Sequence, residues 1–431
     1  MDTLQPLLIA LQSVFTRSKN KRHLFGDIIL AIIIPFGSAK SSNLYRKLTH
    51  ILNHTISKTR FYRFMASNFL PWDKIWPCVF KLISLPMTNG RLLLALDDST
   101  NPKSGKKIFG CEHFFDHAAK HNQSKYPWSQ CFVQIGLLKF IHTRWAFLPL
   151  LSKFYQSAKA VSEDNFKSKI EQSIEIILSI SNWSKAPILV VMDSWFGNGK
   201  LYIPLKEKLG ERIHVLSMLR KNSALYELLP EQEKKKRGRP AKYGKQAGSV
   251  KSLAEQYKSQ ASKVQSFVYG KQREMTIYEN TFMSKSFKRT VKVVFAYHKN
   301  HYVALVTTDL TLTSEQILEY YSARWKIESG FKELKHDIGS QSTQARLKAS
   351  VINHLNMCML ATTLIWVAVM QLQESAVAEL TCQGLKPKFT FSQARMLIIS
   401  NLNKGADWSQ NKNEPKKHKK PWLQMIIELA A

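Results

Sequence analysis

The sequence predicts an α/β protein in which a central sheet and one long helix bring acidic side chains together. The apolar runs 92–96 and 187–192 each end in aspartate, as buried strands do when they carry polar groups to a sheet edge. Residues 313–338 have helical apolar periodicity and carry a further acid beside the apolar stripe. The 63 Lys and Arg residues outnumber the 31 Asp and Glu residues along the whole chain, giving a net charge of +32. A polyanion such as nucleic acid is therefore the expected partner.

Residues 1–88 are expected to form a small helical domain. The apolar run 24–34 ends at Pro35, and Ser57 is placed to cap a helix that begins after it. Bases and aromatic residues are interleaved here, at Arg46, Lys47, Lys58, Arg60, Tyr62 and Arg63. This pattern is typical of a helix-turn-helix-like DNA-binding unit, and a helical cap packed on the central domain would show it equally.

Residues 89–346 are expected to form the central domain. The first apolar run ends in Asp97, Asp98, Ser99 and Thr100, and the second ends in Asp193. The remaining elements are strands predicted at 131–140 and 146–151 and a helix predicted at 164–180. An RNase H-like (retroviral-integrase-like) core has this order of elements. A strand that ends in an acid is followed by further strands, a helix, a second strand that ends in an acid, and an acid on a distant helix. Three carboxylates that converge in this way can hold two divalent metal ions.

The helix predicted at 313–338 opens with Thr313 and Gln316, a pattern that caps a helix N-terminus. At about 100° per residue its buried stripe consists of Tyr320, Ile327, Phe331, Leu334 and Ile338. The edge beside that stripe carries Tyr321, Arg324, Glu328 and Lys335. An acid among cations at the rim of a core suits a metal ligand surrounded by phosphate-binding groups. An ordinary amphipathic helix would use the same residues for intrahelical ion pairs.

The spacing Tyr-x2-Arg-x3-Glu-x6-Lys resembles the signature of DDE transposases from bacterial insertion sequences, in insertion-sequence family four. The resemblance covers residues 92–347. It implies that Asp98, Asp193 and Glu328 are the catalytic, metal-binding acids, with two Mg²⁺ ions that Mn²⁺ can replace. The sequence does not decide between Asp97 and Asp98, and Asp98 is chosen because it directly precedes the hydroxyl pair, as in the family's Asp-Thr-Thr-like pattern.

The resemblance also implies DNA contacts. Tyr321, Arg324 and Lys335 would grip the phosphates or the distorted transposon end, and Lys103 and Lys107 are further candidates for backbone contact. A β-rich insertion at about 212–308 is expected, as in the family, with a strand at 267–279 among others. Within it, Arg237 and Arg239 resemble a minor-groove hook, although a mobile phosphate-contacting loop is favoured. No Trp occurs between Phe196 and Arg324, whereas well-known members stack an insertion-domain Trp on a flipped base.

Several patterns argue for a cytoplasmic protein without a membrane segment. The five cysteines form no CxxC pair and are expected to be reduced thiols. The N-terminus lacks the charge order of a signal peptide, and the apolar run 361–370 is too short to span a bilayer, so it is expected to be a buried helix. His113, His117 and His121, with Cys111, could bind zinc, but a structural or DNA-facing role is favoured.

The resemblance implies a DNA transposase. It would bind the terminal inverted repeats of its element as double-stranded DNA, cleave the ends by hydrolysis and join the 3′-OH ends to target DNA. Residues 347–431 are expected to be helical and, by the resemblance, to join two protomers as a homodimer in the DNA complex. The alternatives are an inactive transposase-derived DNA-binding protein and an RNase H-like nuclease without strand transfer.

Overall fold

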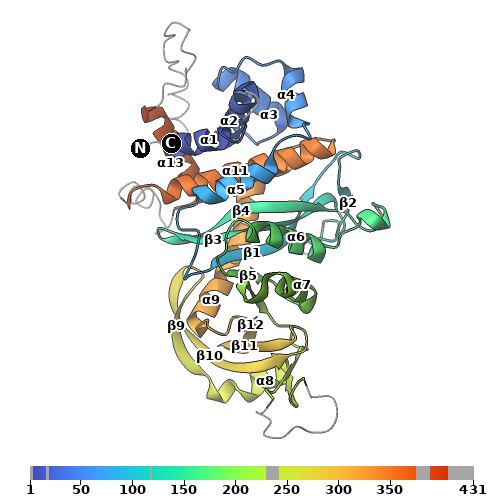
Figure 1. Cartoon of the computed structure of the whole chain (residues 1–431), viewed down its shortest axis with the longest axis vertical. Helices are drawn as coiled ribbons and strands as arrows, with labels where there is room; N and C mark the ends of the chain where they lie inside the picture. The colour runs from blue at the N-terminus through green and yellow to red at the C-terminus, as the bar shows by residue number, and fades with distance from the viewer. Residues whose placement is uncertain (1–2, 16–18, 117–118, 230–241, 375–388, 406–431) are drawn as a thin grey trace.

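The computed structural model describes residues 3–15, 19–116, 119–229, 242–374 and 389–405 (Figure 1). A single large mixed sheet runs through the middle of the molecule. Most helices lie above it in the view of Figure 1, and a curved β-rich lobe continues it below.

Five strands form the centre of the sheet, in the order β4-β3-β1-β5-β6. Strand β1 (Leu92–Pro102) pairs antiparallel with β3 (Trp128–Ile141), which pairs antiparallel with β4 (Arg144–Tyr155). On its other side β1 pairs in parallel with β5 (Ile188–Met192), and β5 pairs in parallel with β6 (Ile213–Met218). The mixed α/β architecture and this large sheet fit an RNase H-like core.

The apolar runs form strands because both of their faces are covered. The side chains of Leu92 to Leu96 and of Ile188 to Met192 are fully buried. Continuous apolar runs are the pattern expected for strands buried between helical layers. Strand β1 extends beyond its apolar run, through the acids, to Pro102. It does so because residues 97–102 also pair with β3.

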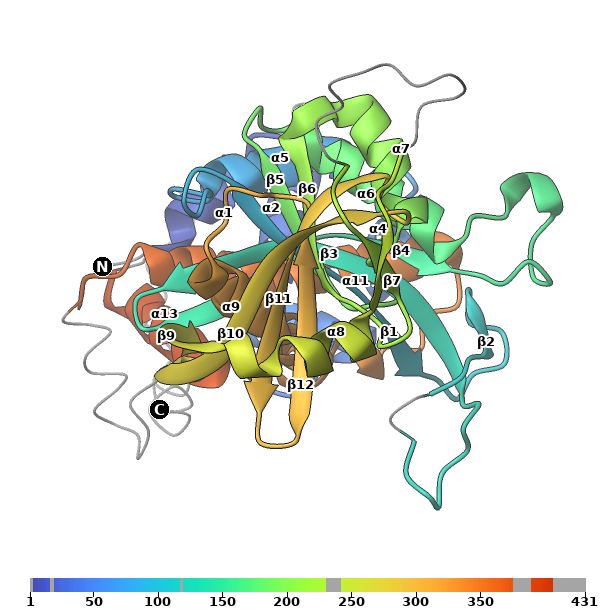
Figure 2. The same cartoon turned by 90° about the horizontal axis from the view of Figure 1, so that it is seen from below.

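The sheet continues into the β-rich lobe through antiparallel pairing of β6 with β12 (His301–Thr307). The other strands of the lobe are β7 (Ala224–Tyr226), β8 (Gln246–Ser249), β9 (Ser262–Val268), β10 (Lys271–Ser284) and β11 (Arg289–His298). The single strand predicted at 267–279 is wrong. Tyr269 and Gly270 both have positive φ, 50° and 76°, and form the tight turn of the β9–β10 hairpin. Figure 2 shows these long strands curving across the sheet.

Helices cover the sheet on the side of the N-terminus (Figure 1). The N-terminal helices are α1 (Leu4–Gln12), α2 (Lys19–Ile33), α3 (Ser41–Arg46), the π-helical turn Lys47–Ile51, α4 (Lys58–Met65) and α5 (Trp72–Leu82). Helices α1, α2, α4 and α5 pack on α11 (Lys348–Met370). Trp72 Nε1 donates to Asn353 Oδ1 and Trp76 Nε1 donates to Asn356 Oδ1, each at 2.8 Å. The other helices of the described chain include α6 (Lys169–Ser181), α7 (Gly199–Leu209), α8 (Val250–Gln256) and α13 (Phe391–Gly405).

Two of these helices bear on the sequence predictions. Helix α6 begins at Lys169, later than predicted, because Ser168 and Glu171 form a capping box there. Helix α11 is, within the described residues, the one helix whose length and composition would suffice to cross a membrane, and 94% of its most apolar stretch is buried inside the protein. The expectation that 361–370 belongs to a buried helix is confirmed.

Candidate active site

The helix predicted at 313–338 forms as three consecutive segments. They are α9 (Ser314–Ala323), α10 (Trp325–Lys332) and a π-helical turn, η5 (Glu333–Asp337). Thr313 and Gln316 make the predicted capping box at its start. The predicted apolar stripe is fully or almost fully buried, with Phe331 the most exposed member at 7%. Periodicity therefore located both the helix and its buried side correctly.

Arg324, at the junction of α9 and α10, connects two acids. Its Nη1 donates to Oδ2 of Asp97 at 3.2 Å, and its Nη2 donates to Oε1 of Glu328 at 3.1 Å. The whole residue is 7% exposed. The guanidinium therefore joins the acid of the helix to the acid of β1 from a buried position.

Asp97 and Asp98 lie on opposite faces of β1, because side chains alternate along a strand. Asp97 faces Arg324, whereas Asp98 accepts a hydrogen bond from Lys169 Nζ on α6 at 2.7 Å. Cys131 Sγ also contacts Asp98 Oδ2, at 3.6 Å. Asp98, the β1 residue predicted to act with Glu328, pairs instead with Lys169 of α6. The residue of β1 that shares a partner with Glu328 is Asp97.

Asp193 lies beside Asp97 at the same edge of the sheet. Leu96 and Met192 are partners in the parallel β1–β5 register, so the acids that follow them are neighbours. Oδ1 of Asp193 accepts the backbone N–H groups of Trp195 (3.0 Å) and Phe196 (3.1 Å), which fixes the turn after β5.

The Asp97 carboxyl has a raised pKa, of about 7. Burial is the main cause, the negative charge of Asp193 adds to it, and the positive charge of Arg324 opposes it. Two acids whose charges repel each other in a buried corner are a place where an added cation is favourable.

Lys335 and Tyr321 take positions beside this corner. Lys335 Nζ donates to Ser99 Oγ and to the Thr100 carbonyl, both at 2.6 Å, and burial lowers its pKa to about 8. Tyr321 is half-buried, with the Arg324 guanidinium 5.9 Å from its ring centroid. Lys335 thus links η5 to β1.

The other predicted DNA contacts fall into three groups. Lys103 is buried, its Nζ donates to the carbonyls of Gln341 and Thr343, and burial lowers its pKa to about 8, so its ammonium faces the protein interior. Lys107 is exposed. Arg237 and Arg239 lie outside the described residues.

Two exposed tryptophans next to the acids were missed by the sequence analysis. Trp195, two residues after Asp193, is 45% exposed, and Trp325, next to Arg324, is 47% exposed. Large apolar side chains exposed beside a polar site are candidates for contact with nucleotide bases. Their positions directly after a predicted strand-end acid and within the predicted helix motif were the available signal.

The acids suit a hard divalent cation by the chemistry of their donors, because Asp97, Asp193 and Glu328 all offer carboxylate oxygens. Among the described residues, however, no three His, Cys, Asp or Glu side chains are grouped closely enough to hold a metal ion. Arg324 forms ion pairs with both Asp97 and Glu328. Of the histidine series, His113 Nδ1 contacts the Tyr126 carbonyl at 2.9 Å, and His117 lies outside the described residues.

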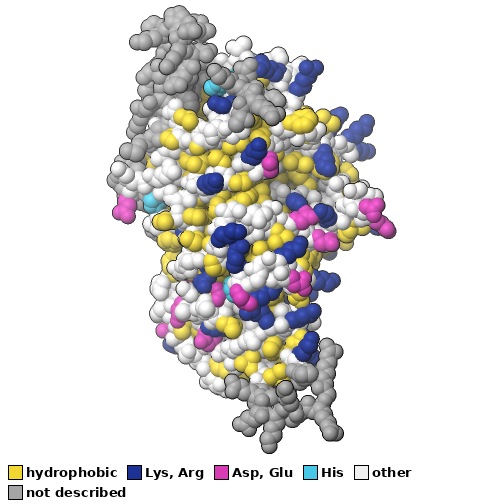
Figure 3. All heavy atoms as spheres, viewed as in Figure 1, with side chains coloured by type: hydrophobic (Ala, Val, Ile, Leu, Met, Phe, Trp, Pro, Cys, Tyr) yellow, Lys and Arg dark blue, Asp and Glu magenta, His cyan; other side chains and the backbone are white. Residues whose placement is uncertain are grey.

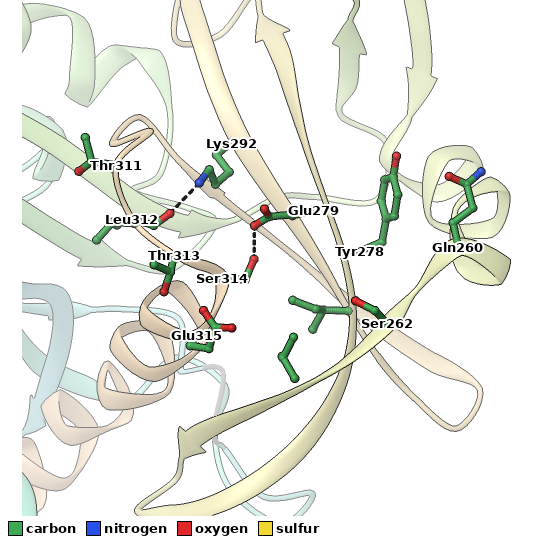
Figure 4. A pocket seen from close by; sticks show the side chains of 12 residues that line it. Gln260, Ser262, Tyr278, Glu279, Lys292, Thr311, Leu312, Thr313, Ser314 and Glu315 are labelled. Carbon is green, nitrogen blue, oxygen red and sulfur yellow. Dashed lines mark hydrogen bonds between the residues drawn. The ribbon is translucent and has the colours of Figure 1, made fainter.

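A cavity of about 490 Å³ lies away from the acids, between β9–β11 and the start of α9 (Figure 4). Its polar side chains already bind one another. Ser314 Oγ donates to Glu279, and Lys292 Nζ donates to the Leu312 carbonyl at 2.7 Å. These contacts join the lobe to α9, and we therefore place the candidate active site at the acids.

The mixed α/β fold and its large sheet fit an RNase H-like core, the class of fold expected for a DDE-type nuclease or transposase. A family model described as DDE superfamily endonuclease matches residues 10–275, more than half of the chain. The chain belongs to this superfamily. Its members generally use divalent metal ions, and their substrate is DNA. The match includes Asp97, Asp98 and Asp193 and ends before Glu328. No curated protein sequence matches the chain.

Proposed function

We propose that the protein is a DNA transposase of the insertion-sequence family four type. It binds the terminal inverted repeats of its element, cleaves the ends by hydrolysis and joins the freed 3′-OH ends to target DNA. The observation that carries the proposal is that the buried Arg324 joins Asp97, which lies beside Asp193, to Glu328. The Tyr-Arg-Glu-Lys spacing along α9, α10 and η5 supports the narrower family assignment.

Asp97, Asp193 and Glu328 would hold two Mg²⁺ ions, which Mn²⁺ can replace. Such ions activate the attacking oxygen and stabilise the leaving oxygen of a phosphodiester. Asp97 takes the place first given to Asp98, because Asp97 shares Arg324 with Glu328 while Asp98 pairs with Lys169. The backbone bonds of Trp195 and Phe196 orient Asp193, and the packing of α10 on the sheet orients Glu328.

DNA is held by groups around the acids and by the helical N-terminal region. Tyr321 and Arg324 contact the transposon strand near the cleaved phosphate, and Lys107 contacts the backbone further along. Lys335 positions β1 against η5. The N-terminal helices bind the terminal repeat, and two protomers assemble on DNA as a homodimer. We expect the protein to act in the bacterial cytoplasm.

The test uses the purified protein and a labelled duplex that carries the DNA end flanking its own gene. With Mg²⁺ the wild type should cut at the element end and join it to a second duplex. Ca²⁺ should support binding without cutting. Glu328→Gln keeps the size of the side chain but removes its charge, so it should reduce cleavage at least about a thousandfold, a loss typical of removing an essential catalytic group, while binding stays near normal. Cleavage by Glu328→Gln at the wild-type rate would contradict the assignment.

The same assay separates Asp97 from Asp98. Asp97→Asn should abolish cleavage as Glu328→Gln does, whereas Asp98→Asn should retain measurable cleavage. The reverse order would return the first metal position to Asp98. Binding without cutting by the wild type in any metal would indicate a retired transposase that binds DNA, and cutting without joining would indicate a nuclease.

A further inference from the structure

We infer that the Arg324 guanidinium stands in for a divalent cation at the acids, and that cation binding transfers Arg324 from the acids to DNA phosphate. The inference rests on the proposed function, since it concerns the same acids. Arg324 would bind either the two acids or a DNA phosphate, and the binding of metal and the binding of DNA would therefore depend on each other.

The contacts of Arg324 place positive charge between the acids. One terminal nitrogen binds Asp97 and the other binds Glu328, the acid of the strand and the acid of the helix. Both bonds use carboxylate oxygens that a metal ion would need. A guanidinium and a divalent ion bound to the same oxygens repel each other, because charges a few ångströms apart in a partly buried site are less screened than in water. Metal and Arg324 therefore compete for the same oxygens.

The rest of Arg324 is arranged so that only its side chain has to move. Its backbone is helical and its N–H donates to the carbonyls of Tyr320 and Tyr321, which fixes the start of the side chain. Nε is buried and has no hydrogen-bond partner, so the guanidinium is held through its terminal nitrogens and its contact with Tyr321. The guanidinium also lies 5.6 Å from the ring of Trp325, which is 47% exposed. The Arg324 guanidinium can stack on that exposed ring, nearer the surface. There it can bind a phosphate through two parallel hydrogen bonds.

Interdependence of metal and DNA follows from this competition. Without DNA, Arg324 neutralises the acids and weakens metal binding. A phosphate beside Trp325 gives the guanidinium another partner, so DNA raises metal affinity and, by linkage, metal raises DNA affinity by the same factor. The acids thereby bind metal more weakly until DNA is in place.

The experiment measures Mn²⁺ binding to the full chain without DNA, by electron paramagnetic resonance of free Mn²⁺. Arg324→Gln should bind Mn²⁺ about tenfold more tightly than the wild type, because about 1.4 kcal/mol of competition is a factor of ten. The matched control is Arg91→Gln. Arg91 precedes β1 and makes a partly buried ion pair with Asp309 at 3.0 Å, separated from Asp97 by the apolar half of the strand. Arg91→Gln removes the same charge as Arg324→Gln and should leave the affinity for Mn²⁺ unchanged.

If the role of Arg324 is purely structural, Arg324→Gln should not raise the affinity for Mn²⁺. Its loss would let the repelling acids move apart, so Mn²⁺ would bind equally or more weakly, and that result overturns the inference. Thermal unfolding provides a second readout if Arg324→Gln is less stable. Mn²⁺ should then raise its Tm more than it raises that of the wild type, because at one ligand concentration a tighter ligand stabilises the folded state more, by RT ln(1 + [L]/Kd). An equal or smaller rise also overturns the inference.

Adding a short duplex completes the test. DNA should raise the Mn²⁺ affinity of the wild type severalfold and leave that of Arg324→Gln nearly constant, since the competitor is already gone. If the wild type cuts DNA but Arg324→Gln shows no tighter Mn²⁺ binding, this inference fails and the proposed function stands. If the wild type neither binds Mn²⁺ with DNA nor cuts, the proposed function fails with it.

Discussion

His354 is buried on α11 and must stay uncharged in the folded protein. Its Nε2–H donates to the Ala39 carbonyl at 2.6 Å, and burial lowers its pKa from 6.5 to about 4. The unfolded chain therefore binds more protons between pH 6.5 and pH 4, and stability falls as pH falls through this window. At pH 5 the loss from this residue is about 2 kcal/mol.

The comparison is between the wild type and His354→Gln, whose amide can make the same bond. Urea unfolding at pH 7.5 and pH 5 should show the wild type losing about 2 kcal/mol more than the variant. Glu333 acts in the opposite direction, because its burial raises its pKa to about 7, so only the difference between the two proteins isolates His354. An identical pH response in both proteins would contradict the assignment.

At the scale of single residues, the sequence indicated which side chains belong to the site better than it indicated on which face of a strand, or how deeply buried, each one lies. Helical spacing placed Arg324 and Glu328 on one edge, because a period near 3.6 is set by the backbone itself. It could not choose between Asp97 and Asp98, since consecutive strand residues face opposite sides and the choice depends on what packs on each side. Nor could it show that Lys103 is buried, because its partners are carbonyls more than two hundred residues away.

At the scale of elements, Gly330 allows α10 to lie close to β4. A Cβ at this position would lie 2.4 Å from Cδ1 of Phe147, which is buried in β4. Gly330→Ala gains about 1 kcal/mol of helix propensity, but overpacking of a dense core costs about 1–3 kcal/mol. We expect a net loss of about 1 kcal/mol in unfolding free energy, and slower cleavage because Glu328 lies two residues away on the same helix.

Chemical denaturation of Gly330→Ala and of its neighbour Ser329→Ala checks this balance. Ser329 is half-buried on the same helix and should tolerate Ala with little change or a slight gain. If Gly330→Ala is as stable as Ser329→Ala, the contact with Phe147 does not set the position of α10.

Elements were predictable where a local signal exists. Thr313 with Gln316 marked the start of α9 correctly, because a capping box is a short-range pattern. The β9–β10 turn was missed because Tyr269 and Gly270 interrupt an otherwise strand-like run without a strong two-residue turn pair. The pairing of β6 with both β5 and β12 is a long-range choice that no local pattern records.

At the scale of the molecule, α11 joins the N-terminal helices to the helix that carries Glu328. Asn353 Nδ2 donates to the carbonyls of Met65 and Ser67, at 3.0 and 2.7 Å, and so holds the end of α4. Further along α11, Trp366 Nε1 donates to Glu333 Oε2 at 3.3 Å, in the turn that follows α10. DNA bound by α4 would therefore be held at a fixed position relative to the acids.

The exposed side of α4 is suited to DNA. Lys58, Arg60, Tyr62 and Arg63 are exposed on it, and no Asp or Glu occurs between Asp27 and Asp73. Figure 3 shows Lys and Arg side chains, and no acidic ones, over this part of the surface. The buried side of the helix, with Phe61 and Phe64, keeps this face turned outward.

Removal of two charges from α4 should therefore change the salt dependence of DNA binding. Each lost phosphate contact makes the slope of log K against log salt concentration shallower by about 0.9, so Arg60→Gln with Arg63→Gln should change it by about 2. Fluorescence anisotropy of a labelled duplex at several salt concentrations measures this. The control, Lys74→Gln with Lys81→Gln, removes the same charge from exposed positions on α5 and should change the slope by much less. Equal changes in both double variants would mean that the general charge of the protein, and not α4, attracts the DNA.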